Sequence, residues 1–362
     1  MKICFIAPKA YTLFNPKVKS GFGGSEVQLN LLANELAKND ELNINFMVAD
    51  YGQKEIEIHS KIYVWKSLDF NKSTLKQVWD FCYTFNRINA DIYVLSSMSP
   101  IAGLISFYCK LINKKFFFMI ANDGETDKSH KVYGKVFSRI LSNLVFKCST
   151  YIVVQNTYQQ KCLWKYEGKN SIIIKPASYM RTHVSKNRDS ILWVGRLDKG
   201  FKRPEFFIRL SESFPEQNFL MIALPATNQL DYFHHVEKQA SYRKNIEFIP
   251  FVPFNDTDKH FRKAKIFINT SVQEGFPNTF VQAAKNKVPI LSLKVNPDNF
   301  LDGIECGFSC DDNFNLLKEK LSKLLTDKKL FESMSESVYA YGRKNLDIAI
   351  NAKRFLDLIK AA

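Results

Sequence analysis

The sequence has no long hydrophobic run. Its longest uninterrupted apolar stretch is about six residues, at positions 116–121, whereas a helix needs roughly 20 apolar residues to cross a bilayer. A transmembrane helix is therefore not expected. Residues 1–8 combine a short apolar segment with an early proline and have no small-residue cleavage site, which is unlike a signal peptide. We therefore expect a cytoplasmic location.

Signs of disulfides and metal binding are also scarce. The chain has seven cysteines, an odd number, and no CxxC pair. This usage is typical of reduced thiols in a cytosolic protein. Cys306 and Cys310 lie near each other in sequence, but no matching His or Cys cluster accompanies them. The sequence predicts no metal site.

Several catalytic signatures are missing as well. We find no HExxH, no Gly-x-Ser-x-Gly and no Walker loop. Paired catalytic carboxylates with glycosidase-like placement cannot be identified either. Hydrolytic chemistry by these routes has no support in the sequence.

The composition is that of a folded, basic protein. The 362 residues are 46% hydrophobic, which excludes a disordered chain and suggests roughly two domains at about 150 residues each. With 51 basic and 36 acidic residues the net charge is +15. Residues 110–175 hold 12 Lys/Arg against 4 Asp/Glu, a net of +8. This charge favours nucleic acid, phosphorylated substrates or an acidic membrane face, and by itself does not choose among them.

One basic segment is strongly periodic. Val132, Val136, Ile140 and Leu144 repeat every four residues and are flanked by lysines and arginines. An interfacial membrane helix has this pattern. A core-packed helix with a basic outer face has it too, and we favour that simpler interpretation.

Apolar runs alternate with amphipathic stretches in two series. The first predicts strands at 2–7, 44–49, 92–96, 115–120 and 151–154, with helices at 27–36, 75–88 and 132–145. The second predicts strands at 191–194, 219–223, 246–249, 266–269 and 289–292, with helices at 204–214, 231–239, 280–285 and 315–325. This βαβα order predicts two parallel sheets covered on both faces. The polar, turn-rich residues 175–190 are the predicted linker between them.

The first motif is glycine-rich. Gly21-Phe22-Gly23-Gly24-Ser25-Glu26 precedes a predicted helix. Glycines let the backbone approach a ligand, and a helix N-terminus presents free N–H groups to an anion. Alternatively, Ser25-x-x-Gln28 is a capping box, and the segment is only a well-capped helix start.

The second motif follows the first strand of the second series. After Gly195 comes a basic loop with Arg196 and Lys202, and Pro204 suits the first turn of the next helix. At the carboxyl end of a strand, the forked guanidinium of Arg196 and the ammonium of Lys202 can together bind a diphosphate. The alternative is a solvated basic loop.

The third motif follows the strand at 266–269. Glu274 can accept hydrogen bonds from sugar hydroxyls, and the amides of Asn278 and Thr279 can face a phosphate or hydroxyl. The alternative is again local, because Thr279-x-x-Gln282 is a capping box.

Together, these segments resemble the GT-B glycosyltransferases of family 4. The resemblance rests on the order and spacing of the Gly23-Gly24 loop, Val153-Val154-Gln155, Gly195-Arg196-Leu197 with Lys202, and Glu274-Gly275-Phe276. It is strongest with a bacterial subset carrying an EGFPNTF-x-QA signature, many of which build surface polysaccharides. The implied fold is α/β, GT-B, with two Rossmann-like domains facing across a cleft. The expected domains are 1–178 for the acceptor and 179–344 for the nucleotide-sugar, with a helix at 345–362 that packs back on the first.

The resemblance also implies roles for residues of the second domain. Arg196 and Lys202 bind the diphosphate, and Glu274 holds hydroxyls of the transferred sugar. Gln282 stands at the second position of a Glu-x7-Glu motif and contacts the ribose, although as an amide it carries no charge. The remaining donor-site residues implied are Phe251 and Val252 at the base, Phe276, Asn278 and Thr279.

Fewer residues of the first domain are implicated. Gly23 and Gly24 approach the diphosphate or the acceptor. Asp123, after the strand at 115–120, is the acceptor-side candidate, with a plain Asn-Asp-Gly turn as the alternative. Pro277 replaces a usual glycine and removes one N–H donor.

The implied reaction transfers a hexose-type sugar from a UDP- or GDP-sugar to a glycan or lipid-linked acceptor. Such enzymes retain anomeric configuration without a metal or other cofactor. A lipid-linked acceptor suits a peripheral contact with the acidic inner face of the plasma membrane. Two other hypotheses stay open: a basic nucleic-acid-binding protein, and a GT-B-like binding subunit that has lost activity, with Gln282 and Pro277 as signs of drift.

Overall fold

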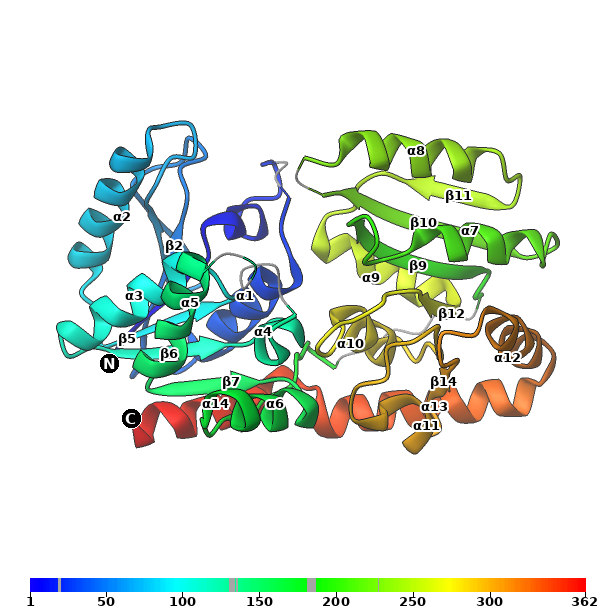
Figure 1. The fold of residues 1–362 in the computed structure, drawn as a ribbon. Helices are drawn as coiled ribbons and strands as arrows, with labels where there is room; N and C mark the ends of the chain where they lie inside the picture. Colours follow the sequence, from blue (N-terminus) through cyan, green and yellow to red (C-terminus); the bar gives the residue numbers. More distant parts are fainter. Residues whose placement is uncertain (19–20, 130–133, 135, 181–186, 227) are drawn as a thin grey trace. The chain divides into compact units, whose positions relative to one another are not determined.

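The computed structural model describes residues 1–362 except 19–20, 130–133, 135, 181–186 and 227 (Figure 1). The chain divides into two compact units. The first unit comprises Met1–Ala177 and Ile348–Ala362, and the second comprises Ser178–Asp347.

The first unit is built on an eight-stranded sheet in the order β3-β4-β2-β1-β5-β6-β7-β8. The described pairings are parallel apart from the hairpin of β3 and β4. The strands are β1 (Lys2–Ile6), β2 (Asn43–Val48), β3 (Ile56–His59), β4 (Ile62–Lys66), β5 (Ile92–Ser96), β6 (Lys115–Met119), β7 (Tyr151–Val154) and β8 (Ile172–Ile173).

Strand β1 shows why both faces of this sheet are covered. Ile3 and Phe5 enter one hydrophobic core, whereas Cys4 and Ile6 enter another, because successive side chains point to opposite faces. The 3₁₀ helix η1 (Pro8–Leu13), α1 (Gly24–Leu36) and α14 (Ile348–Ala361) pack in the first core. The second core holds α2 (Thr74–Ile88), α3 (Pro100–Leu111), α5 (Val136–Cys148) and α6 (Thr157–Glu167).

The second unit has a six-stranded parallel sheet in the order β11-β10-β9-β12-β13-β14. Its strands are β9 (Ser190–Leu197), β10 (Asn218–Pro225), β11 (Ile246–Ile249), β12 (Ala264–Asn269), β13 (Ile290–Ser292) and β14 (Gly307–Ser309). One face is covered by α7 (Pro204–Glu212), α8 (Leu230–Ser241) and α12 (Phe314–Thr326). The other is covered by α9 (Phe254–Lys263), α10 (Asn278–Lys285) and α11 (Phe300–Gly303). The long helix α13 (Lys328–Asn345) contributes to both cores.

The prediction of two Rossmann-like α/β domains is confirmed, and the predicted strands coincide with described ones. The sequence patterns did not indicate α3. Ala102 and Ile105 on its inner side are buried, but Ile101 and Leu104 on its outer side are apolar as well, so the helix has no polar face to reveal it. Of the predicted helix 132–145, residues 132, 133 and 135 lie outside the described residues, and α5 is described from Val136 onward.

Two further features are absent from the part of the chain that the structure describes. No described helix combines the length and the apolar composition that crossing a bilayer requires. No group of three or more His, Cys, Asp or Glu side chains is placed to hold a metal ion among the described residues.

Candidate functional site

The carboxyl ends of β9 and β12 form the most favourable place for a ligand in the second unit. After β9 the chain builds β10 and β11 on one side of it, and β12 then pairs with β9 on the other side. Open α/β sheets bind ligands at such a topological switch point, outside the carboxyl ends of the strands. The loop with Lys202 follows β9, and the loop with Glu274 follows β12.

The structure brings two predicted site residues into contact at this edge. The Lys202 ammonium lies 2.9 Å from Oε1 of Glu274, and the two side chains are 22% and 19% exposed. Asn269, the last residue of β12, donates from its amide to the same carboxylate oxygen at 3.0 Å. Both groups are thus held in place and still reach solvent.

The environment of Glu274 keeps this side chain ionised. Burial alone would raise its pKa, but the neighbouring Lys202 charge and hydrogen bonds from Ser271, Lys202 and Asn269 lower the pKa below its usual range. An ionised carboxylate only accepts hydrogen bonds and has several lone-pair positions. Glu274 is therefore suited to receive hydroxyl groups of a ligand.

Thr270 fastens the Lys202 loop to the end of β12. Its hydroxyl accepts from the ring N–H of Trp193 at 2.9 Å and donates to the carbonyl oxygen of Lys202 at 2.5 Å. The backbone N–H of Val272 donates to the carbonyl of Phe201 at 2.9 Å. Thr270 is completely buried. These bonds fix the backbone that carries the Lys202 side chain.

Two more residues shape the same loop. Gly200 has a φ of +78°, a conformation that other residues adopt only with strain. Arg203 donates to the carbonyl of Thr270 at 2.9 Å and pairs with Asp312 at 2.7 Å. The sequence patterns gave no indication of a role for Thr270 or Arg203. The signal available was weak, since neither stands at a motif position, and their partners are distant in sequence.

Arg196 makes a different contact. Its Nε and one terminal nitrogen both lie 2.8 Å from Oδ2 of Asp198, and its side chain is 49% exposed. The structure does not join it to the Lys202–Glu274 pair. An exposed ion pair contributes only about 0.2–1 kcal/mol, so an anionic ligand can displace Asp198 at little cost.

Helix α10 begins at Asn278, with Pro277 as the residue before it. Asn278 and Thr279 form the start of its first turn, and the N–H of Phe280 donates to the carbonyl of Pro277 at 3.0 Å. The predicted capping box of Thr279 and Gln282 is wrong, because the helix starts too early for Thr279 to cap it. Gln282 is buried and donates to the hydroxyl of Thr257 on α9 at 2.8 Å.

The remaining donor-site candidates are Phe251, Val252 and Phe276. Val252 and Phe276 pack in the core that α10 covers. The ring of Phe276 is buried between Phe280 and Phe300, with centroid distances of 6.3 and 5.3 Å. Only its backbone is therefore suited to ligand contact. Phe251 is partly exposed and Val252 is buried, in the segment that joins β11 to α9.

The glycine-rich segment of the first unit is capped differently from the prediction. Helix α1 starts at Gly24, so Glu26 stands at its third position, and its carboxylate accepts from the N–H of Gly23 at 2.9 Å. The predicted Ser25–Gln28 capping box is wrong. The Gln28 side chain instead pairs with the backbone of Ala177, at 2.8 and 3.1 Å. Glu26 therefore supplies negative charge at this helix N-terminus.

Asp123, the acceptor-side candidate, precedes the short helix α4 (Gly124–Asp127). Its Oδ1 accepts from the side-chain amides of Asn156 at 3.1 Å and Gln159 at 3.0 Å. These partners follow β7, whereas Asp123 follows β6, the neighbouring strand. The two amides fix the orientation of the carboxylate.

Glu125 is a second carboxylate at this place, and the sequence analysis missed it. It is 1% exposed, accepts from the N–H of Ala121 at 3.1 Å, and accepts from the Asn122 amide at 3.0 Å. Burial raises the pKa of Glu125 to about 7, although backbone hydrogen bonds oppose the shift. A glutamate in a polar turn gives no sequence signal of such burial.

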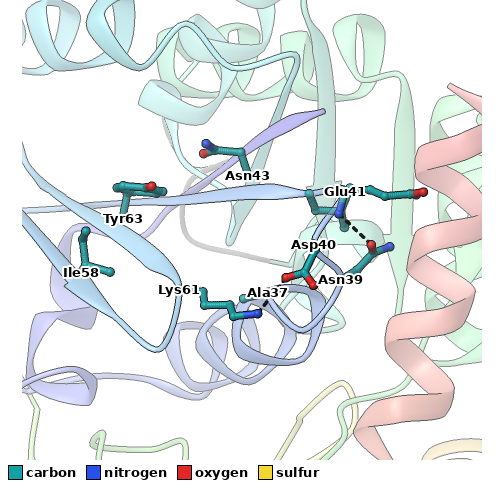
Figure 2. Close-up of a pocket in the computed structure, with 9 residues that line it drawn as sticks. Ala37, Asn39, Asp40, Glu41, Asn43, Ile58, Lys61 and Tyr63 are labelled. Carbon is teal, nitrogen blue, oxygen red and sulfur yellow. Dashed lines mark hydrogen bonds and ion pairs between the residues drawn. The ribbon is translucent and has the colours of Figure 1, made fainter.

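A surface pocket of about 430 Å³ lies elsewhere in the first unit (Figure 2). It is lined by the turn between α1 and β2 and by the β3–β4 hairpin, and Asp40 and Lys61 pair across it at 2.7 Å. None of the predicted site residues lines it. The pocket is therefore not part of the candidate site.

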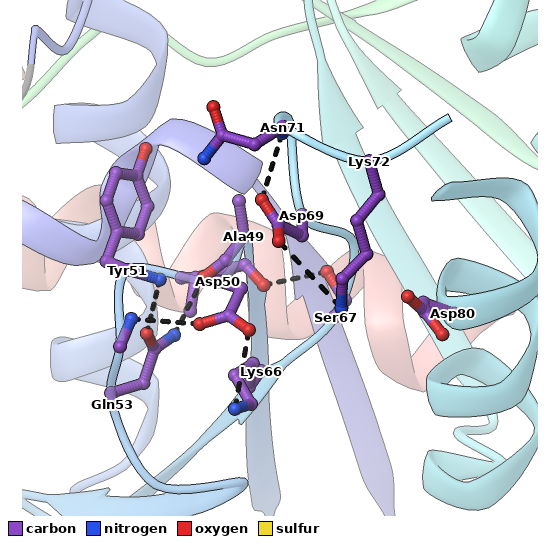
Figure 3. Close-up of polar contacts among 12 residues, drawn as sticks. Ala49, Asp50, Tyr51, Gln53, Lys66, Ser67, Asp69, Asn71, Lys72 and Asp80 are labelled. Atoms are coloured by element: carbon purple, nitrogen blue, oxygen red, sulfur yellow. Dashed lines mark hydrogen bonds and ion pairs between the residues drawn. The ribbon is translucent and has the colours of Figure 1, made fainter. Parts of the chain in front are cut away.

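Polar contacts join the segment that follows β2 to the segment that follows β4 (Figure 3). Ser67 donates to the carbonyl of Val48 at 2.7 Å, and Gln53 donates to the carbonyl of Ala49 at 2.7 Å. The Lys66 ammonium lies 3.4 Å from Asp50. These contacts satisfy backbone groups where the strands end, which is a structural role.

Known proteins resemble this chain in sequence and in fold. Residues 188–327 match the family model described as Glycosyl transferases group 1. The capsular polysaccharide biosynthesis glycosyltransferase CapM of Staphylococcus aureus is 26% identical over 162 residues, which are 43% of this chain and 40% of that relative. The match thus spans less than half the length of the curated relative.

Solved structures cover the whole chain. Sucrose-phosphate synthase from Thermosynechococcus elongatus superposes with a TM-score of 0.82 and 12% identity, covering 99% of this chain and 98% of that one. HepE of Anabaena, in complex with UDP and glucose, gives a TM-score of 0.77 at 12% identity and full coverage of both chains. The protein therefore has the two-domain fold of the GT-B glycosyltransferases, and its second unit carries the region that matches the group 1 family model.

Proposed function

We propose that the protein is a glycosyltransferase that moves a hexose-type sugar from a UDP- or GDP-sugar to a glycan or lipid-linked acceptor, in the synthesis of a bacterial surface polysaccharide. The observation that carries the proposal is the Lys202–Glu274 pair at the switch point between β9 and β12. It lies within the region that matches the group 1 family model. The UDP and glucose bound by HepE, and the capsular role in the name of CapM, support the donor and the pathway class.

The second unit binds the donor through charge and hydroxyl recognition. Lys202 and Arg196 neutralise the diphosphate, the first as a point charge and the second as a fork. The first-turn amides of α10, at Asn278 and Thr279, add N–H donors. Glu274 accepts hydrogen bonds from the hydroxyls of the sugar that is transferred.

The nucleoside end is bound more by shape and backbone. Backbone groups of Phe251, Val252 and Phe276 contact the base and its linkage to the sugar. Gln282 donates from its amide nitrogen to Thr257, and its amide oxygen accepts from a ribose hydroxyl. An amide binds a diol without charge, which suits a residue that does not take part in proton transfer.

The transfer retains anomeric configuration and needs no metal. The bond between the anomeric carbon and the diphosphate oxygen breaks, and the acceptor oxygen bonds to the same face of that carbon. The proton of the acceptor hydroxyl goes to the departing phosphate. Lys202, Arg196 and the α10 amides stabilise the negative charge that develops there.

The first unit provides the acceptor side. The Asp123 carboxylate, held by two amides, accepts a hydrogen bond from a neighbouring hydroxyl of the acceptor, one that does not react. The backbone at Gly23 and Gly24 approaches the diphosphate or the acceptor. A lipid-linked acceptor places the enzyme in the cytoplasm, in peripheral contact with the acidic inner face of the plasma membrane.

The test is nucleotide release from a panel of UDP- and GDP-sugars, with and without EDTA. We expect slow release from one donor, insensitive to EDTA. Lys202→Ala should weaken nucleotide binding by about 10- to 100-fold, since a charged hydrogen bond contributes roughly 1.5–3 kcal/mol. Lys199→Ala removes an exposed lysine of the same loop and is the matched control.

Two results would contradict the proposal. One is the absence of both release and thermal stabilisation by UDP and by GDP. The other is equal affinity in Lys202→Ala and Lys199→Ala, which would remove Lys202 from the site. Stabilisation without release, in the presence of candidate acceptors, would identify a binding subunit instead of an enzyme.

A further inference from the structure

Helix α6 presents aromatic rings and lysines on its outer side. Tyr158 and Trp164 are 49% and 62% exposed, and Lys161 and Lys165 are exposed as well. The inner side of the helix packs in the core of the first unit, through Leu163. Exposed apolar groups that gather at one place mark interaction sites. We call Tyr158, Lys161, Trp164 and Lys165 the α6 aromatic–lysine face.

The members of this face follow each other along the helix. Tyr158, Lys161 and Lys165 are three and four residues apart, so they lie on one side of α6. Trp164 stands three residues after Lys161 and lies beside that line. The face extends over about 10 Å, at 1.5 Å per residue. Rings and ammonium groups therefore alternate along a strip.

The positive charge of the face is not neutralised within the helix. Glu167 is the acidic residue of α6, and its carboxylate lies 3.0 Å from the ammonium of Lys128. The Lys165 ammonium lies over the ring of Tyr166, 5.1 Å from its centroid, a contact that leaves the lysine charged. The face therefore attracts an anionic ligand.

The face begins beside the acceptor-side carboxylate. Asn156 caps α6 by accepting from the N–H of Gln159 at 2.7 Å, and the side-chain amides of both residues hold Asp123. Tyr158 stands between them and donates from its hydroxyl to Asp127 at 3.1 Å. One end of the face thus adjoins two carboxylates, whereas its lysines lie about one and two turns further along the helix.

This change of charge along the helix selects the kind of ligand. Beside Asp123 a ligand must present hydroxyl groups, because a carboxylate accepts hydrogen bonds and repels anions. Beside Lys161 and Lys165 a ligand gains from negative charge. The rings of Tyr158 and Trp164 offer flat apolar faces to the C–H faces of sugar rings. A sugar chain with a neutral reacting end and negatively charged units behind it meets all these conditions.

We propose that the α6 aromatic–lysine face binds the acceptor behind its reacting end, and that this acceptor is an acidic glycan. Its carboxylate or phosphate groups lie at Lys161 and Lys165, and its sugar rings lie against Trp164 and Tyr158. The inference rests on the proposed function and deepens it by naming the chemical class of the acceptor.

Two other anionic partners fit this face less well. A single-stranded nucleic acid also stacks on aromatic rings, but it carries a phosphate at every nucleotide and would place one beside Asp123 and Asp127. A bilayer surface is bound through a broad apolar face. The α6 face instead consists of two separate rings with lysines between and beside them.

The experiment is equilibrium binding of short oligomers to the full chain at low salt, without a donor. The two acidic probes are hexagalacturonate, which carries carboxylates, and phosphorylated mannohexaose. Unphosphorylated mannohexaose is the neutral probe, and a uridine hexanucleotide represents nucleic acid.

The test variant is Lys161→Gln/Trp164→Gln. Its matched control is Lys76→Gln/Trp79→Gln on α2, which removes the same two residue types at the same spacing, with Trp79 66% exposed.

We expect the wild-type protein to bind at least one acidic probe about tenfold more tightly than the neutral probe and the hexanucleotide. The test variant should lose about tenfold in affinity for that probe, and the control variant less than about twofold. Affinity should fall as salt is added, because salt screens the charges. A second variant, Lys161→Glu/Lys165→Glu, keeps both rings and should abolish the preference for the acidic probe. It also serves if the first variant fails to fold.

Three results would overturn the proposal. They are a wild-type protein that prefers neither acidic probe, an equal loss in the test and control variants, and tighter binding of the hexanucleotide than of both acidic glycans. Nucleotide release from the donor, measured without acceptor, separates this inference from the proposed function. Release without acidic-glycan binding would overturn this inference alone. Binding of the acidic glycan without release from any donor would contradict the proposed function and leave the glycan-binding face standing.

Discussion

The substitution Thr270→Val tests how the candidate donor site is held together. The Thr270 hydroxyl is completely buried, accepts from the ring N–H of Trp193, and donates to the carbonyl of Lys202. Valine has nearly the same shape and can do neither. The substitution therefore removes two hydrogen bonds and leaves the cavity filled.

The cost follows from the groups that are left behind. Trp193 is 2% exposed, so water cannot replace the hydrogen bond that its N–H loses. A buried polar group without a partner costs about 1–3 kcal/mol, and the carbonyl of Lys202 adds a similar or smaller amount. We expect a loss of about 3 kcal/mol in the free energy of unfolding of the second unit. For a domain of its size this lowers Tm by roughly 6–12 °C.

Calorimetry of the full chain is the assay, with UDP and GDP binding as a second measurement. Thr270→Ser is the matched control. It keeps the hydroxyl and loses one buried methyl group, which costs about 1 kcal/mol. Nucleotide binding should weaken in Thr270→Val and not in Thr270→Ser. If the two variants unfold at the same temperature, or if Thr270→Val unfolds like the wild type, the hydroxyl does not hold the loop.

Four further substitutions test other parts of the structure. Gly103→Ala should destabilise the first unit by several kcal/mol, measured by denaturant unfolding, because the new Cβ would lie 1.7 Å from the carbonyl oxygen of Leu141. The pKa of Glu125 is raised from 4.5 to about 7 in the folded protein. The unfolded chain therefore loses this proton first, and the folded state loses stability as the pH rises from about 4.5 to about 7. Glu125→Gln should therefore gain about 3 kcal/mol relative to the wild type between about pH 5 and pH 8, and parallel pH curves would contradict the burial argument. Glu274 has a lowered pKa, so its contribution to stability is lost as pH falls through that value. In the wild type, the urea midpoint of unfolding should therefore fall at acid pH. Glu274→Gln and Lys202→Met should each remove this part of the fall. If neither variant changes the pH dependence of the midpoint, the pair does not affect stability.

The corrected helix caps show where local patterns are ambiguous. Ser25-x-x-Gln28 and Thr279-x-x-Gln282 both have the form of a capping box, and neither forms one. In each case the helix begins earlier than the pattern requires, and the glutamine bonds elsewhere, to Ala177 and Thr257. A four-residue pattern fixes the spacing of its members but does not decide which tertiary partner competes for them.

The exposed outer side of α3 is an instance of the same ambiguity on a larger scale. A helix with apolar residues on both sides reads as buried, and α3 is apolar on both sides. Only the structure separates the inner residues, such as Ile105, from outer ones, such as Leu104. Exposure is a property of the packed fold, and the sequence of α3 by itself does not contain it.

The sequence by itself predicted ten of the described strands, their order and the loops that carry Lys202 and Glu274, but not β3, β4, β8 or β14. Strand β1 is an example, since its side chains point alternately to two hydrophobic cores. A strand buried on both faces is a continuous apolar run, as at Ile3, Cys4, Phe5 and Ile6, and such a run can be recognised without a structure. The positions of Lys202 and Glu274 after strands could also be predicted, since strand and loop are local features. Parallel pairing of two such strands then places their following loops at one edge of a sheet.

Only the tertiary structure decided which groups meet there and in what state. Thr270 bonds to residues 77 and 68 positions away, Trp193 and Lys202. Burial by other elements raises the pKa of Glu125 to about 7. Hydrogen bonds and pKa values depend on distances of a few ångströms between segments far apart in the chain. These distances are set by the packing of whole sheets and helices, and a local pattern of residues does not specify them.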